Sequence, residues 1–256
     1  LHFSHIGLTD GLTFSGSIAA TYATAIIAGY QQEQTALTQA PFQIQTENRM
    51  IYNPLMKSSY MFVPGIMGLV LMIICTIMTS VSIVREKERG TMEVLLASPL
   101  KQGTMIFAKT VPYMVISFVD FVIILLLSYF ILDVPVNGSL ILLFAVASIY
   151  IALTLTYGLT VSTLVDKQVN AVIVSAITAM IPVLMLSGMI FPIDNMPRAL
   201  QAFSSIVPAR WFIEAVRKVM IQGLGLGLIW KEVLIMIGMT LFLLGVTIAK
   251  TKKRLE

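Results

Sequence analysis

The side chains that could do chemistry in this sequence are few and lie far apart. His2 and His5 lie close together, but a structural metal site needs about four ligands and no third candidate is near them. The sequence contains no G-x-x-x-x-G-K-[ST] phosphate-binding loop, no H-E-x-x-H motif and no G-x-S-x-G motif. No nucleophile–base pair is recognisable, which disfavours a membrane-embedded hydrolase. We therefore expect no catalytic residue, cofactor site or metal site in this chain.

One acid, Asp120, lies inside a long apolar stretch. An ionised carboxylate in a membrane costs roughly 2.5–3.5 kcal/mol, so Asp120 should face protein or water, or be protonated. Two interpretations are open: a hydrogen bond to a neighbouring helix, or a proton relay or contact with a cationic substrate. In the next apolar stretch, Thr156, Thr160 and Thr163 form one polar stripe, which serves either helix packing or a substrate path.

The composition indicates an integral membrane protein. Hydrophobic residues make up 57% of the sequence and the mean hydropathy is +0.88, while 12% is charged against roughly 25% in globular proteins. A soluble fold of this length could not bury so much apolar surface. The net charge of +4 does not form a nucleic-acid-binding patch, and Cys75, the single cysteine, excludes an intrachain disulfide.

Five stretches are long and apolar enough for transmembrane helices, which need about 20 residues each. They are residues 61–84, 106–132, 139–165, 169–190 and 233–249, and residues 224–229 could extend the last one across Lys231 and Glu232. The runs are continuous and do not alternate, so the expected fold is all-α rather than a β-barrel.

The basic residues give the expected orientation. The segment from Arg85 and the tail from Lys250 are rich in Lys and Arg, whereas residues 133–138 contain neither. Because short cytoplasmic loops carry the excess of Lys and Arg, both basic segments should be cytoplasmic. Residues 1–60 then lie outside, as the C-terminal part of an external, periplasmic domain, and residues 61–256 form the transmembrane domain. In the external part we predict an amphipathic helix over residues 17–31 and a short strand over residues 42–46.

The segment after the first span combines charge with a short apolar face. Thr91 can cap a helix that starts at Met92, and Pro99 disfavours helix at the residue before it. Met92, Leu95 and Leu96 share one face of this helix. It either lies on lipid headgroups or inserts into a groove of a cytoplasmic partner and transmits motion to the spans through Gly90. The charged residues that orient it or pair with the partner are Arg85, Glu86, Glu88, Arg89 and Glu93.

A second segment, residues 191–223, is too polar to span the membrane. Pro197 and Pro208 can each open a short helix, and Trp211 suits the membrane interface. We expect an external helical hairpin that dips into the outer leaflet and returns.

These two segments resemble the type-2 ABC exporter permeases, in the bacterial branch with a large external domain between the first two spans. The matching residues, which cover about positions 50–256, are the run from Arg85, Glu86, Glu88, Arg89 and Gly90 to Glu93, then Ser98-Pro99, Asn53-Pro54, Val63-Pro64-Gly65, Ser187-Gly188, Phe191-Pro192, Met196-Pro197 and Pro208-Ala209-Arg210.

The resemblance implies six spans per subunit, with one upstream of Leu1, and pairing with a second permease subunit as a homodimer or heterodimer. It also implies docking of a cytoplasmic ATPase dimer, which binds ATP and Mg²⁺, through residues 92–97. Helices at about residues 197–205 and 209–222 would help to close the outer end of the path. Asp120 matches no motif of the family.

We therefore expect a permease of an ATP-driven exporter in the bacterial cytoplasmic membrane, in contact with membrane lipids and with a periplasmic adaptor as a further partner. The substrate would be a drug, a lipid or another amphipathic molecule. The alternative is a proton-coupled secondary transporter that uses Asp120, although inverted repeats and several intramembrane ionisable groups would then be expected.

Overall fold

The computed structural model describes residues 22, 25–26, 29–30, 58–90 and 102–253. The chain divides into two units, Leu1–Met61 and Phe62–Glu256. In the first unit, the described residues Tyr22, Ala25, Ile26, Gly29 and Tyr30 are helical, in agreement with the predicted helix over residues 17–31. The strand predicted over residues 42–46 lies outside the described residues. The assignment of residues 1–60 to an external domain stays a prediction.

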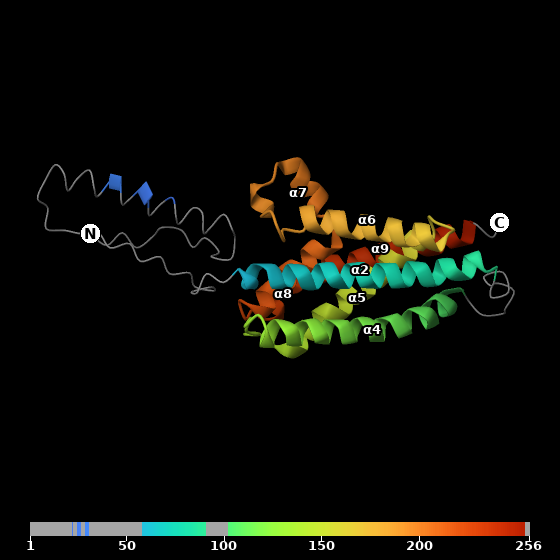
Figure 1. The fold of residues 1–256 in the computed structure, drawn as a ribbon, viewed down its shortest axis with the longest axis horizontal. Helices are drawn as coiled ribbons and strands as arrows, with labels where there is room; N and C mark the ends of the chain where they lie inside the picture. Colours follow the sequence, from blue (N-terminus) through green and yellow to red (C-terminus); the bar gives the residue numbers. More distant parts are fainter. Residues whose placement is uncertain (1–21, 23–24, 27–28, 31–57, 91–101, 254–256) are drawn as a thin grey trace, which may run out of the picture. The chain divides into compact units, whose positions relative to one another are not determined.

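Five long helices make up most of the second unit, and the prediction of five membrane-spanning helices is confirmed. They are α2 (Ser59–Glu88), α4 (Gln102–Phe130), α5 (Leu140–Ser162), α6 (Gln168–Leu186) and α9 (Leu226–Lys253). Each is long and apolar enough to cross a membrane. The last helix begins at Leu226 and therefore includes Lys231 and Glu232. This matches the predicted extension of the last span across these two residues. Figure 1 shows these helices lying side by side.

Helix α5 forms the core of this bundle. It is uncharged and apolar on all sides, which is the pattern of a helix surrounded by other helices. Near its middle, the Tyr150 ring stacks on Phe212 at a centroid distance of 4.0 Å. The Tyr150 hydroxyl donates to the carbonyl oxygen of Gly68 on α2, at 2.8 Å. The buried phenol therefore has a partner for its polar end on α2, while its ring packs against the helix that carries Phe212.

Small residues allow α2 to approach α5 and α6 closely. A Cβ atom on Gly158 of α5 would lie 2.8 Å from the carbonyl oxygen of Thr76 on α2, so no larger residue fits without movement. Ser80 of α2 and Ser175 of α6 form a hydrogen bond of 2.6 Å between their hydroxyls. Close backbones joined by small and hydroxyl residues are typical of helix contacts inside a membrane.

Two short helices follow α6 and correspond to the predicted hairpin. A 3₁₀ turn, η1 (Ile193–Asn195), leads into α7 (Arg198–Ser204), and α8 (Pro208–Met220) follows. Pro197 precedes α7 and Pro208 is the first residue of α8, where its missing N–H leaves no helical hydrogen bond unmade. Both helices lie at the end of the bundle where α2 begins (Figure 1), which is the predicted outer end.

Candidate functional site

The charged tip of α2 is bound to three other helices at the predicted cytoplasmic end. Glu86 forms an ion pair with Lys109 of α4. Lys87 donates to the carbonyl oxygens of Ser162 and Val165, where α5 ends; the contact to Val165 measures 3.3 Å. The last carbonyls of a helix have no partner within it and carry partial negative charge, so a Lys ammonium is well suited to this place.

Glu88 binds the start of α6. One of its carboxylate oxygens, Oε2, accepts from the backbone N–H of Gln168 at 3.2 Å and from the Gln168 side chain at 2.8 Å. Arg85 donates to the same Gln168 side chain at 3.3 Å. The N-cap residue of α6, Lys167, makes no side-chain capping bond of its own. A carboxylate from α2 therefore supplies the negative group that the N-terminus of α6 favours.

The rest of the predicted coupling set lies at or beyond this tip. Arg89 is exposed, and Gly90 ends the helix with a φ of 71°, a left-handed conformation in which glycine is favoured. Thr91, Met92, Glu93, Leu95 and Leu96 lie outside the described residues, so their roles stay predictions. Within the described part of the chain, the structure places Glu86 and Glu88 against α4 and α6.

At the outer end, Arg210 joins α8 to α7. Its Nη1 donates to the Gln201 carbonyl oxygen at 3.2 Å and to the hydroxyls of Ser204 and Ser205 at 3.3 and 3.0 Å. The adjacent indole of Trp211 donates to the Ser205 carbonyl oxygen at 2.9 Å. These contacts fall on the last turn of α7, where free carbonyls favour a cation.

The other predicted gate residues gather around the connection between α6 and α7. Ser187 is buried and donates to the Val183 carbonyl oxygen, and Gly188 turns the chain with a φ of 80°. Ser204 of α7 donates to the Leu186 carbonyl oxygen, which attaches α7 to the end of α6. The remaining ones flank the turn η1: Phe191 and Pro197 are exposed, and Pro192 and Met196 are half-buried. Their role in closing a path stays a prediction.

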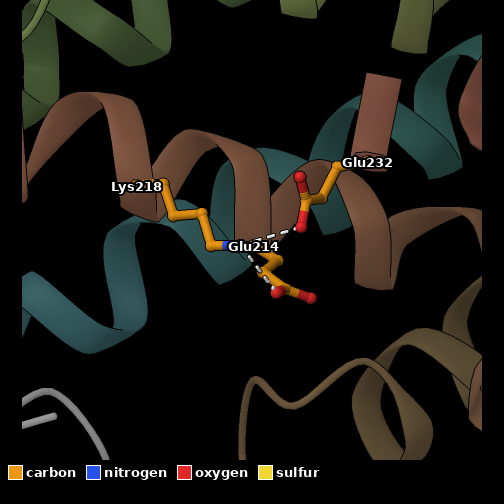
Figure 2. A network of polar contacts seen from close by, with 3 residues as sticks. All are labelled: Glu214, Lys218 and Glu232. Atoms are coloured by element: carbon orange, nitrogen blue, oxygen red, sulfur yellow. Dashed lines mark hydrogen bonds and ion pairs between the residues drawn. The ribbon is translucent and has the colours of Figure 1, made fainter. Parts of the chain in front are cut away.

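An ion-pair network joins α8 to α9 and was not predicted from the sequence. Lys218 of α8 contacts Glu232 of α9 at 2.8 Å and Glu214, one turn earlier on α8, at 3.1 Å (Figure 2). Glu232 is 2% exposed. Burial lowers the pKa of Lys218, but its hydrogen bonds to the two carboxylates outweigh that effect, and the pKa is raised overall. The available signal was the Lys231-Glu232 pair interrupting an otherwise apolar run.

Asp120, Thr156 and Thr160 do not form one site through hydrogen bonds. Asp120 is half-buried on α4, and within the described ranges no hydrogen bond or ion pair joins it to another residue. The hydrogen bond from Asp120 to a neighbouring helix, one of the two interpretations of this residue, is therefore not seen among the described residues. Thr156 donates to the Ala152 carbonyl oxygen of its own helix, and Thr160 contacts Thr247 of α9 at 2.9 Å. Both hydroxyls thus have partners within or beside α5, and a substrate path along them stays a prediction.

Taken together, the bundle of five apolar helices, the charged tip of α2 and the outer helical pair define a multi-pass membrane protein. Residues 6–249 match the model of the ABC-2 family transporter proteins. The chain belongs to this family and is a multi-pass protein of the bacterial inner membrane.

Several curated relatives align with most of the chain. A probable multidrug ABC transporter permease of Escherichia coli K12, YbhS, is 36% identical over 213 residues, which are 83% of this chain and 56% of the relative. A second one, YbhR, is 31% identical over 218 residues, 85% of this chain and 59% of the relative. ABC transporter G family member 20 of Dictyostelium discoideum is 26% identical over 220 residues, 85% of this chain and 30% of the relative. The chain thus spans a little over half the length of the bacterial relatives, and no solved structure gives a significant match.

Proposed function

We propose that this chain is the membrane part of a permease that exports an amphipathic molecule, such as a drug or a lipid, with energy from ATP. The observation that carries the proposal is the tip of α2, whose charges bind α4, α5 and α6 immediately before the predicted coupling helix. Family membership supports a transport role, and the multidrug description belongs to the relatives YbhS and YbhR.

The proposed partners follow from this arrangement. A cytoplasmic ATPase dimer would bind ATP and Mg²⁺ and contact residues 92–97, while a second permease subunit, identical or different, would complete the path. A periplasmic adaptor is a further candidate partner on the outer side. Closure of the ATPase would shift the helix bundle between inward-facing and outward-facing packings, because a partner changes an equilibrium by binding one state better.

The proposed coupling is tested by Leu95→Asp in the full-length protein reconstituted with its ATPase. A carboxylate on the apolar face should abolish docking, so ATP-dependent export of a fluorescent dye is expected to fall by at least about tenfold, corresponding to roughly 1.4 kcal/mol. Membrane insertion should not change. Leu95→Met, which keeps the face apolar and nearly preserves the side-chain volume, is the matched control and should leave export unchanged. Unchanged export by the Leu95→Asp variant would refute the coupling role.

A second candidate function, proton-coupled transport, is favoured by one observation: Asp120 is half-buried in a membrane-spanning helix and, among the described residues, has no hydrogen-bond partner. Such a residue is a functional candidate in a membrane. Asp120→Asn separates the two functions. Loss of transport by this variant while the ATPase still hydrolyses ATP would support proton-coupled transport. Persistence of ATP-dependent transport would support the ATP-driven exporter.

A further inference from the structure

Two consecutive residues of α2 bind the facing ends of two other helices. Lys87 contacts the carbonyls where α5 ends, and Glu88 contacts the N–H where α6 begins. Only residues 163–167 separate the two helices, so these ends of opposite partial charge lie close together. Successive side chains of a helix point about 100° apart, which allows one short segment of α2 to reach both.

We infer that Lys87 and Glu88 are positioning residues that fasten the α5–α6 connection to the tip of α2. A displacement that arrives at Gly90 then moves the cytoplasmic ends of α5 and α6 together with α2. The inference rests on the proposed function for the source of that displacement. The fastening itself is defined by the contacts and can be tested without a partner.

The geometry next to the tip fits this role. Gly90 follows Glu88 by two residues, has a φ of 71°, and has no described heavy atom within 4 Å of the place where a Cβ would lie. The described chain therefore turns out of the helix at Gly90, close to the two contacts. The Glu86–Lys109 ion pair extends the attachment to α4.

The first test measures the attachment in the full-length protein without nucleotide. The backbone N–H of Gln168 donates to Glu88, so Glu88→Ala should accelerate hydrogen exchange at Gln168. Glu88 is exposed, and contacts of exposed charges are weak, so we expect an acceleration of roughly two- to fivefold. Lys87→Met should accelerate exchange across residues 163–168. The matched control is Lys167→Met, because Lys167 lies in the same connection, is exposed and makes no capping bond.

The second test measures transmission, with the ATPase present and a fluorescent dye as the transported probe. Lys87→Met and Glu88→Ala should lower the number of dye molecules moved per ATP hydrolysed by about fivefold or more, since couplings between sites typically span 5- to 150-fold. Lys87→Arg, which can still donate to both carbonyls, and Glu88→Gln, which still accepts from Gln168, should largely restore the ratio. A purely structural role would lower protein yield and dye transport together and leave the ratio unchanged.

The outcomes separate the two proposals. Unaltered hydrogen exchange in both Lys87→Met and Glu88→Ala would refute the proposed attachment of the α5–α6 connection. Altered exchange with an unaltered number of dye molecules per ATP would refute the transmission of motion through it. A wild-type protein that moves no dye with ATP would refute the proposed function, and the exchange experiment would still decide whether Lys87 and Glu88 hold the connection.

Discussion

At the scale of single residues, Lys218 holds together two helices that follow each other at the outer end. Its ammonium lies between Glu214 and Glu232, and the two carboxylates differ in exposure (Figure 2). The side chain of Glu214 is 40% exposed, so its pair with Lys218 contributes less to stability. Glu232 is buried, and loss of its cation would leave a carboxylate without compensation.

We expect Lys218→Met to lower the free energy of unfolding by about 2–4 kcal/mol, because breaking a buried pair from one side costs several kcal/mol and Lys218 is partly exposed. Thermal unfolding in detergent measures the effect. Lys231→Met is the control: Lys231 is exposed, with its ammonium 6.0 Å from the Trp211 ring, and should contribute less than about 1 kcal/mol. Equal losses in the two variants would contradict a special role of the Glu232 pair.

The direction in which the pKa of Lys218 is shifted determines how its contribution to stability depends on pH. The pKa of Lys218 is raised in the folded chain, so its stabilising effect is fully present below the unfolded value of about 10.4. It is lost only as the pH rises through the higher folded value. Lys218 therefore gives no pH dependence of stability near neutrality.

At the scale of helices, α2 and α5 approach each other closely at Gly158. The missing side chain of Gly158 lets the Thr76 carbonyl oxygen and the Thr79 side chain lie directly against the backbone of α5. The same crossing brings Cys75 of α2 against Ile151 and Leu155 of α5, where Tyr113, Met114 and Phe118 of α4 pack as well. Three helices thus depend on one close approach.

Gly158→Ala should separate α2 from α5, because the new methyl group would lie 2.8 Å from a backbone oxygen that cannot rotate away. Overpacking of this kind typically costs about 1–3 kcal/mol. Gly238→Ala in α9 is the matched control: no heavy atom lies within 4 Å of its Cβ position, and alanine favours helix over glycine by about 1 kcal/mol. The thermal unfolding temperature should therefore fall for Gly158→Ala and rise for Gly238→Ala. A shift of both temperatures in the same direction would contradict the close packing at Gly158.

At the scale of the whole molecule, the sequence predicted the number of spans and the outer helical pair because these depend on local properties. The length of an apolar run fixes whether it can cross a membrane, and Pro197 and Pro208 mark where α7 and α8 start. The contacts of Glu86, Lys87, Glu88 and Glu232 could not be predicted, since each joins segments distant in sequence. A charged helix tip shows that partners are needed without showing which helix supplies them.

The arrangement of the helices predicts on which side of the membrane each end lies. The end of α2 binds the ends of α4, α5 and α6 that the basic residues place in the cytoplasm, and α7 and α8 lie at the opposite end. The side chains of Arg89 at the tip of α2 and Phe203 in α7 are both exposed, so each can be replaced by cysteine as a reporter. Cys75 is buried and hydrogen-bonded to Ser117. Its replacement by serine removes the background thiol.

In intact cells, a membrane-impermeant maleimide should label the Phe203→Cys variant and not the Arg89→Cys variant. Permeabilised cells should show labelling of both, which controls for the reactivity of each thiol. The expectation follows because short segments rich in Lys and Arg, such as the tip of α2, favour the cytoplasmic side, whereas α7 follows the opposite end of α6. Labelling of Arg89→Cys from outside would place the charged tip on the exterior, and an ATPase in the cytoplasm could then not act through it.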